Sequence, residues 1–273
     1  MMGTMLKEKK ERLEGLLKEM DGCVIGFSGG VDSTLLYAVA REVLGDRATA
    51  VTITSEIHPE WELLEARELA AQIDGRHRIL EAKALEIPGL AENPENRCYV
   101  CKKAIAGELW NIAREVGVSF VLDGGNVDDR ADYRPGRQAA IEAGIRSPLE
   151  EADLTKDEIR QLSRSMELPT WNKPSYACLI SRFPYGVYLT RENMRMVAIA
   201  EDFLREMGLR TVRVRFHGDV ARLELGEEEY ERVVHELRQV VVTKVKEAGF
   251  AYVALDLQGY RTGAMNEVLA NTD

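Results

Sequence analysis

The sequence predicts an α/β protein with a doubly wound parallel sheet in its first domain and a smaller α/β domain at its C-terminal end. Three observations predict this fold class. Short apolar or β-branched runs alternate with helical patterns through the first two-thirds of the chain, which is typical of a parallel sheet covered on both faces. A glycine-rich turn follows the first of these runs. The proline-containing segment 169–185 then ends the pattern, and a shorter series of helices and strands follows it.

The elements of the first domain follow from local composition. The run CVIGF at 23–27 is apolar, and the run ATAVTIT at 48–54 is rich in small and β-branched residues, so both are predicted as strands. Further strands are predicted over 78–81 and 120–122, and helices over 33–44, 60–73 and 101–116. Ligands of parallel sheets bind beyond the carboxyl ends of the strands. The turns after CVIGF and after FVLD are therefore the first places to expect a site.

The segment after the proline-containing loop is predicted as a separate compact domain. Its pattern indicates helices over 191–207 and 228–248, and strands over 211–216, 220–225 and 251–257. We place the boundary after residue 183, which gives domains of 1–183 and 184–273.

Composition excludes several classes of protein. No apolar run approaches the roughly 18–20 residues that span a bilayer, and the charged N-terminal 20 residues lack a signal core. We therefore expect a cytoplasmic protein without a membrane partner. The net charge of −10 argues against a nucleic-acid substrate. Four cysteines are too few and too unevenly spaced for a disulfide framework, so metal binding or catalysis is the better expectation.

The glycine-rich turn carries the first functional motif, SGGVDS at 28–33. Gly29 and Gly30 let the backbone pass close to a ligand, and the amides at the following helix N-terminus favour an anion such as phosphate. Ser28 and Ser33 add hydroxyl groups, while Asp32 is placed to hold Mg²⁺ beside the phosphates. The alternative is a plain strand-to-helix turn capped by serine and aspartate.

A second motif, GGNVDD at 124–129, follows the strand FVLD. Gly125 and Asn126 are predicted to contact the nucleotide. The neighbouring carboxylates of Asp128 and Asp129 suit a hard cation that bridges phosphates. The alternative is an acidic turn that caps the next helix.

Three of the four cysteines form a candidate metal site. Cys98 and Cys101 are spaced so that both thiols reach one metal, and Cys178 lies in the segment SYACLISR. Cys23 opens a predicted buried strand and is expected to pack in the core. Three thiolates suit a 4Fe–4S cluster with one open iron. A zinc site completed by a histidine and a pair of redox thiols remain open alternatives.

The string SGGVDS resembles the pyrophosphate-binding loop of the ATP pyrophosphatase superfamily, and GGNVDD resembles that superfamily's GTNxDD segment. The resemblance implies an adenine nucleotide alpha hydrolase-like fold, with ATP and Mg²⁺ as cofactors. It also implies that ATP is cleaved between its α and β phosphates to give an adenylated substrate and pyrophosphate.

A narrower resemblance covers nearly the whole chain. In order, the segments SGGVDS, RCYVCK, DGGNVDDRADYRPGRQA, SPL, KPSYACLISRFPYG, RVRFHGDVARLEL and GYRTGAMNE are similar to the LarE family of ATP-dependent sulfur transferases. The resemblance implies adenylation of a carboxylate of pyridinium-3,5-biscarboxylic acid mononucleotide and its conversion to a thiocarboxylate, a step toward the nickel-pincer nucleotide cofactor. It also implies a homo-oligomer, in which the C-terminal domain contributes to substrate binding or assembly.

Members of this family differ in the number of cysteines at the sulfur-transfer site. Cys178 matches the sulfur-donor position of the single-cysteine members, in which the cysteine is sacrificed and becomes dehydroalanine. This chain also has Cys98 and Cys101, as does the subgroup proposed to hold a 4Fe–4S cluster through three cysteines. There the open iron carries an additional sulfide, which sulfide or a cysteine desulfurase would replenish. We favour the cluster version.

Arginines in the second domain are candidates for binding the substrate. Arg213 and Arg215 are two residues apart and share one face of a predicted strand, and Arg222 is expected to join them across the HGD turn. Guanidinium groups bind phosphate and carboxylate oxygens in pairs. Arg182 follows the third cysteine by four residues and is predicted to lie near the reacting carboxyl. The alternative is a strand face neutralised by neighbouring acids.

Three other functions remain open from the sequence. A tRNA-thiolating enzyme of the same superfamily would use the same motifs, but the acidic charge argues against it. An ammonia-dependent amide-forming synthetase would leave the three cysteines without a role. A non-enzymatic iron–sulfur or zinc module would use ATP only structurally.

Overall fold

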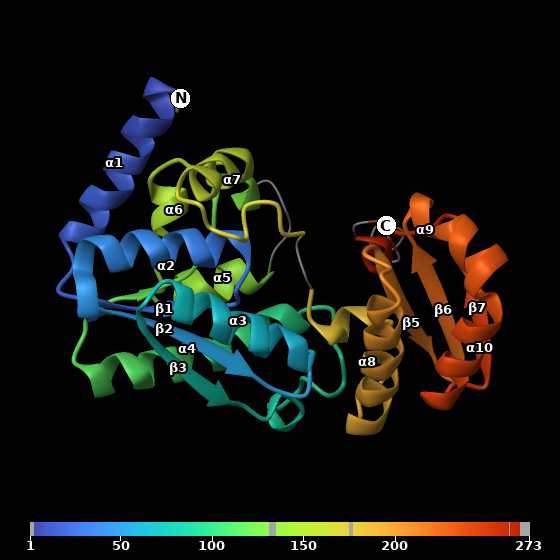
Figure 1. Ribbon diagram of the computed structural model, residues 1–273. Helices are drawn as coiled ribbons and strands as arrows, with labels where there is room; N and C mark the ends of the chain where they lie inside the picture. Colours follow the sequence, from blue (N-terminus) through green and yellow to red (C-terminus); the bar gives the residue numbers. More distant parts are fainter. Residues whose placement is uncertain (1–2, 131–134, 175–176, 262, 268–273) are drawn as a thin grey trace. The chain divides into compact units, whose positions relative to one another are not determined.

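The computed structural model describes residues 3–130, 135–174, 177–261 and 263–267 (Figure 1). The chain divides into two compact units: unit 1 is Met1–Ile87 with Asn96–Tyr176, and unit 2 is Pro88–Glu95 with Ala177–Asp273. The short segment 88–95 therefore belongs to unit 2 although it lies between two parts of unit 1 in sequence. The assignment of separate functions to domains 1–183 and 184–273 stays a prediction.

Unit 1 contains the predicted parallel sheet. Its strands lie in the order β3-β2-β1-β4, and each neighbouring pair is parallel. The strands are β1 (Cys23–Gly26), β2 (Ala48–Thr54), β3 (Arg76–Glu81) and β4 (Val121–Leu122). The helices are α1 (Thr4–Lys18), α2 (Val31–Leu44), α3 (Glu60–Gln72), α4 (Arg97–Val116), α5 (Pro135–Glu142), α6 (Pro148–Glu151) and α7 (Lys156–Ser165). The predicted fold class is confirmed.

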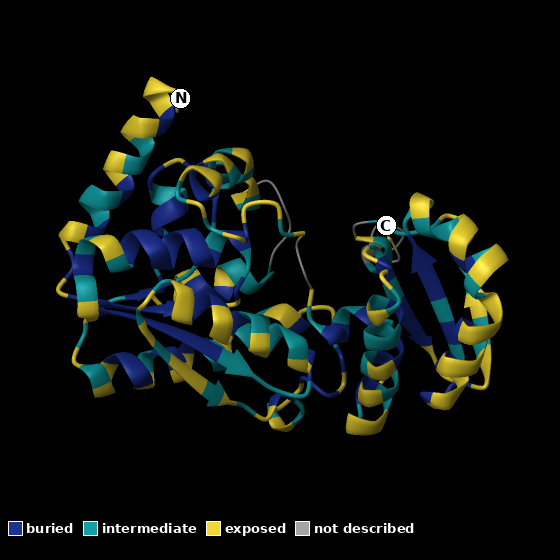
Figure 2. Cartoon of the chain, in the orientation of Figure 1, coloured by how far each residue is buried: buried dark blue, intermediate teal, exposed yellow. Residues whose placement is uncertain are grey.

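Both faces of this sheet are buried, as a parallel sheet requires. On one face Cys23 and Ile25 of β1 pack in a core with residues of α1, α2, α3, α6 and α7. On the other face Val24 packs with residues of α4 and α5. Figure 2 shows β1 and β2 as buried strands between these two helical layers. Cys23 is fully buried, as predicted, and burial raises the pKa of its thiol to about 12.

Two features of unit 1 differ from the sequence-based expectation. Helix α4 begins at Arg97, so the CxxC motif lies inside the helix and not in front of it. The three helices after the second motif were not predicted. Helix α7 nevertheless carries a recognisable start signal, a capping box in which Thr155 and Glu158 each bond the other's backbone. The first residue of this helix, Lys156, contacts the glycine-rich loop.

Unit 2 contains a smaller sheet of three strands in the order β5-β6-β7, with an antiparallel pair followed by a parallel pair. Its elements are α8 (Arg191–Glu206), β5 (Val212–His217), β6 (Val220–Leu225), α9 (Glu227–Arg232), a π-helical turn (Val233–Leu237), α10 (Arg238–Glu247) and β7 (Tyr252–Leu255). The helix predicted over 228–248 is thus divided by the π-helical turn. Val214 and Leu223 are buried neighbours on one face of the sheet, which leaves the opposite face to polar residues.

The segment 88–95 is fixed within unit 2 by Asn93. This residue is fully buried and has a left-handed φ of 52°, which asparagine tolerates better than most residues. Its side-chain amide donates to the carbonyl of Pro184 at 2.7 Å, and its own carbonyl accepts from Gly186 at 2.9 Å.

No helix among the described residues has the length and apolar character needed to cross a membrane.

Candidate functional site

The motif at 28–33, here called the nucleotide loop, connects β1 to α2 at the carboxyl end of the sheet. Gly29 has a φ of +67°, a left-handed conformation that favours glycine, and a Cβ there would also lie 3.3 Å from a methyl group of Leu69. The hydroxyl of Ser33 donates to the carbonyl of Gly30 at 3.2 Å and lies 3.2 Å from the hydroxyl of Ser28. The two serines therefore hold the loop in shape through their own hydrogen bonds.

The motif at 124–129, here called the second loop, packs directly against the nucleotide loop. A Cβ on Gly124 would lie 3.0 Å from both the Cβ of Asp32 and the backbone nitrogen of Ser33. The amide of Asn126 donates to the carboxylate of Asp32 at 3.3 Å, and Asn126 is buried. Two motifs far apart in sequence thus meet at adjacent strand ends, as expected of ligand-binding loops in a parallel sheet.

The carboxylates of the second loop also organise its backbone. Asp128 accepts from the backbone nitrogen of Lys156 at 2.7 Å, and Asp129 accepts from the backbone nitrogen of Asn126 at 3.0 Å. Gly125 donates to Asp123 at 3.1 Å. Within the described ranges, no three His, Cys, Asp or Glu side chains lie together as a metal-binding group. The magnesium role of Asp32, Asp128 and Asp129 stays a prediction.

Two lysines outside both motifs contact the nucleotide loop. Lys156 of α7 pairs with the carboxylate of Asp32, and Lys173 donates to the carbonyl of Gly29 at 2.9 Å. Lys173 also pairs with Glu65 of α3 at 2.7 Å. The capping box at Thr155 is a sequence signal that places Lys156 at the start of a helix. No sequence signal near either lysine indicates that its side chain reaches the nucleotide loop.

The helix that carries the CxxC motif begins beside the second loop. Cys98 is exposed and Cys101 is half-buried, and they are the second and fifth residues of α4. Residues three apart are neighbours on a helix surface, so the two thiols fit a shared metal. Lys102, the next residue, pairs with Asp123 at 3.0 Å, directly before the second loop. Cys178, the third predicted ligand, belongs to unit 2, and all three keep their iron–sulfur role as a prediction.

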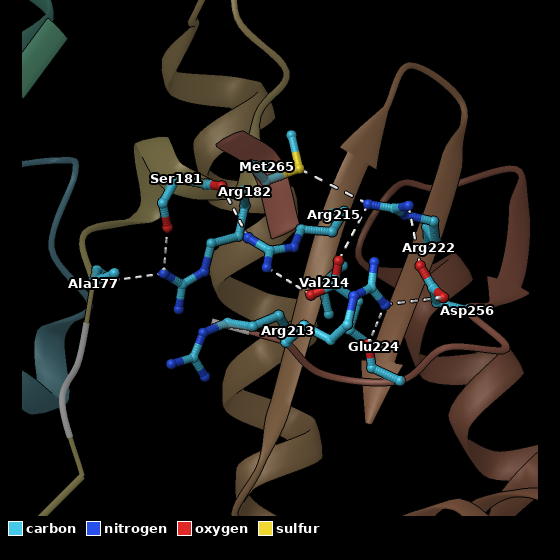
Figure 3. A network of polar contacts seen from close by, with 12 residues as sticks. Ala177, Ser181, Arg182, Arg213, Val214, Arg215, Arg222, Glu224, Asp256 and Met265 are labelled. Atoms are coloured by element: carbon cyan, nitrogen blue, oxygen red, sulfur yellow. Dashed lines mark hydrogen bonds and ion pairs between the residues drawn. The ribbon is translucent and has the colours of Figure 1, made fainter. Parts of the chain in front are cut away.

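Arg182 fixes the backbone around Cys178. It is buried with an exposure of 3% and forms two hydrogen bonds with the carboxylate of Glu201, at 2.7 and 2.9 Å. Its guanidinium also donates to the carbonyl of Ala177 at 2.5 Å and to that of Cys178 at 3.1 Å. Figure 3 also shows the hydrogen bond that its guanidinium donates to the hydroxyl of Ser181. The geometry fits a side chain that positions Cys178, and its catalytic role stays a prediction.

The polar face of the unit 2 sheet gathers the other predicted arginines (Figure 3). The strand register places Arg222 opposite Arg215 and Glu224 opposite Arg213, so all four side chains share one face. Glu224 is fully buried and accepts from Arg215 at 2.6 Å and from Arg222 at 3.2 Å. Arg222 also pairs with Asp256 at 3.0 Å. The acids foreseen in the alternative interpretation are therefore present on this face.

Arg213 differs from its neighbours. In the part of the chain that the structure describes, no carboxylate lies within ion-pair distance of it, and its guanidinium lies over the ring of Tyr260 at 5.2 Å. Burial, followed by the nearby charge of Arg182, lowers the pKa of Arg213 below its ordinary value. Among these arginines, Arg213 is therefore the one whose charge an anionic ligand would stabilise most.

Comparison with known proteins finds similarity in the part of the chain that carries the nucleotide loop. The family model described as asparagine synthase matches residues 22–124, a range that contains the nucleotide loop and ends at the first residue of the second loop. One of the glutamine-hydrolyzing GMP synthase chains of Haloarcula marismortui is 32% identical over 53% of this chain and 50% of its own length. These similarities are confined to part of the chain.

Two of the relatives match over nearly the whole chain. An uncharacterized protein of Synechocystis sp. is 44% identical, covering 97% of this chain and 99% of the relative. The pyridinium-3,5-bisthiocarboxylic acid mononucleotide synthase of Lactiplantibacillus plantarum is 41% identical, covering 97% of this chain and 96% of the relative. Because identity at this level extends through both units, the chain belongs to the LarE family of ATP-dependent sulfur transferases.

Proposed function

We propose that the protein adenylates a carboxylate of pyridinium-3,5-biscarboxylic acid mononucleotide with ATP and replaces the activated oxygen with sulfur. The observation that carries this proposal is the arrangement in unit 1. The nucleotide loop packs against the second loop, and the helix bearing two thiols is fixed beside that loop by the ion pair between Lys102 and Asp123, the residue directly before the loop. The full-length similarity to the synthase of L. plantarum supports this choice of acceptor.

In the first step a carboxylate oxygen of the substrate attacks the α-phosphorus, and the bond to the β-phosphate oxygen breaks to release pyrophosphate. We propose that the backbone amides of Gly29 and Gly30 and the hydroxyls of Ser28 and Ser33 bind the phosphates. Magnesium would neutralise charge on the phosphate oxygens when bound, with its proposed ligands in the two loops.

In the second step a sulfur nucleophile attacks the acyl carbon, and AMP leaves with the electrons of the broken C–O bond. We propose that Arg213, Arg215 and Arg222 bind the phosphate and carboxylate oxygens of the substrate during this step. Arg182 would hold the backbone of Cys178 in place.

Two sulfur sources are compatible with this chain. A 4Fe–4S cluster held by Cys98, Cys101 and Cys178 would supply a sulfide from its open iron. Alternatively, Cys178 would form a thioester, and removal of its Cα proton by a base with cleavage of the Cβ–S bond would leave the thiocarboxylate and dehydroalanine. We favour the cluster, because Cys98 and Cys101 are three residues apart on one helix, a spacing that lets two thiols reach one metal. We also propose a cytoplasmic homo-oligomer that is reloaded by sulfide or a cysteine desulfurase.

The test is a turnover assay with the purified protein, ATP, Mg²⁺ and the biscarboxylic acid mononucleotide. Pyrophosphate release that depends on the mononucleotide, together with a product in which sulfur replaces oxygen, is the expected result. Pyrophosphate release without sulfur in the product would show an adenylating enzyme of another kind. Anaerobic purification with iron and sulfide analysis then separates the two sulfur sources. Cys98→Ala should lose the iron if the cluster is present, whereas a sacrificed Cys178 would appear as loss of hydrogen sulfide from the protein mass.

A further inference from the structure

The nucleotide loop lacks a positive charge of its own. Its six residues, SGGVDS, include the carboxylate of Asp32 but no lysine or arginine. A triphosphate is strongly anionic, and charge-assisted hydrogen bonds are the stronger kind of contact to phosphate oxygens. Backbone amides provide only partial charges at such a site. A loop that binds ATP therefore benefits from cations contributed by other parts of the fold.

Lys156 brings one such cation to the loop from 124 residues away. Its ammonium pairs with the carboxylate of Asp32, and both side chains are half-buried, with exposures of 29% and 21%. Its backbone is fixed as well, because it is the first residue of α7 and its backbone nitrogen donates to Asp128 at 2.7 Å. The second loop and α7 thus hold this lysine at the nucleotide loop.

Lys173 brings a second cation from 144 residues away. Its ammonium donates to the carbonyl of Gly29 at 2.9 Å and pairs with Glu65 at 2.7 Å. The side chain is largely buried, with an exposure of 14%. The two lysines therefore contact opposite ends of the same short turn, one at its second residue and the other at its fifth.

We propose that Lys156 and Lys173 bind the β- and γ-phosphates of ATP and stabilise the pyrophosphate that leaves. This inference rests on the proposed function, because it assigns residues to the ATP site of that reaction. In this proposal the ammonium of Lys156 turns from the carboxylate of Asp32 to the phosphate oxygens when ATP binds, and Asp32 would then be available to hold the magnesium. As the bond between the α-phosphorus and the bridging oxygen breaks, negative charge develops on the leaving pyrophosphate. Fixed ammonium groups favour that charge more than they favour bound ATP.

The test compares the affinities of ATP and AMP by calorimetry in the presence of Mg²⁺. AMP lacks the β- and γ-phosphates, so it serves as the internal reference. In Lys156→Met and Lys173→Met the affinity for ATP should fall by about 10-fold or more for each lysine, as expected for loss of a charge-assisted hydrogen bond. The affinity for AMP should stay within about 2-fold, because neither lysine contacts the α-phosphate in this proposal.

Lys9→Met is the matched control. Lys9 contacts the same end of α7, through Glu158 at 2.9 Å and the carbonyl of Asp153 at 2.5 Å. If loosening of α7 alone explained the loss, this control would show it too, and the proposal for Lys156 would be wrong. Unchanged or tighter ATP binding in Lys156→Met would also overturn it, because the lysine would then only neutralise Asp32. An equal loss of ATP and AMP affinity would overturn the assignment to the β- and γ-phosphates.

These measurements need no acceptor, which separates this inference from the proposed function. A wild-type protein that binds ATP but never releases pyrophosphate would contradict the function and leave the assignment of the lysines to be decided by the affinities. A wild-type protein that turns over while both lysine variants bind ATP normally would contradict only the assignment of the lysines.

Discussion

Neutralising Glu224 should destabilise unit 2 more than any exposed charge in that unit. This carboxylate has no exposure to solvent, and it accepts from Arg215 at 2.6 Å and from Arg222 at 3.2 Å. The change Glu224→Gln keeps the size of the side chain but removes the negative charge. It leaves the guanidinium of Arg215, which is only 6% exposed, without its ionic partner.

The size of the destabilisation expected for Glu224→Gln follows from the burial of the ion pair. Removing one partner of a buried ion pair costs roughly 3–5 kcal/mol, because the other charge remains buried and uncompensated. Arg215 keeps its hydrogen bond to the carbonyl of Ser181 at 2.9 Å, and the glutamine amide oxygen still accepts one hydrogen bond. We therefore expect a loss of unfolding free energy at the lower end of this range, about 3 kcal/mol. With a urea dependence of about 1.5 kcal/mol per M, the midpoint should fall by about 2 M.

The assay is urea unfolding followed by far-ultraviolet circular dichroism, with Glu247→Gln as the control. Glu247 pairs with Lys244 at 2.6 Å, the same separation as Glu224 and Arg215, but its side chain is 56% exposed. An exposed pair of this kind contributes only about 0.2–1 kcal/mol. If the two variants lost the same free energy, or if Glu224→Gln lost less than about 1 kcal/mol, burial would not control the strength of this network.

Three further predictions concern unit 1. Burial raises the pKa of the Cys23 thiol to about 12. In the folded, cluster-free protein, iodoacetamide at about pH 8 should therefore alkylate exposed Cys98 and reach Cys23 only in denaturant, as read by mass spectrometry; equal rates would contradict this. Burial by itself raises the pKa of Asp123, but the adjacent lysine and the hydrogen bonds to the carboxylate hold it below its ordinary 3.8. The unfolding free energy lost in Asp123→Asn should therefore be constant above about pH 5 and shrink as the pH falls through the lowered pKa, and a loss independent of pH would refute the assignment. Gly124→Ala should weaken ATP binding in calorimetry, because its Cβ would lie 3.0 Å from atoms of the nucleotide loop, whereas Gly107→Ala on α4 has open space and should bind ATP normally.

Local patterns predicted the scaffold of unit 1 well. The run at 48–54 has the bounds of β2, and the first strand and the helix after it were displaced by only one or two residues. Such agreement is expected where composition and periodicity are strong over a whole element. The helices α5, α6 and α7 were missed because they are short and follow loops. For α7 the capping box at Thr155 and Glu158 was the available signal.

Local patterns predicted the candidate site less completely. The two loops were recognised from their own residues, and their convergence follows from the parallel sheet. The parallel sheet does not predict that Lys156 and Lys173 contact the nucleotide loop, because the positions of the segments that carry these lysines depend on the tertiary fold. The same is true of Glu201, which binds Arg182 from α8 and carries no motif of its own.

The sequence by itself determined the parallel α/β fold, the two nucleotide-binding motifs, the CxxC spacing and the family resemblance, because each depends on residues close together in the chain. Only the tertiary structure decided which charges meet. It paired Asp32 with Lys156, buried Glu224 between Arg215 and Arg222, and left Arg213 without a carboxylate partner among the described residues. The physical reason is that the strength of a charge interaction depends on distance and burial, and both are fixed by packing between distant segments and not by local order.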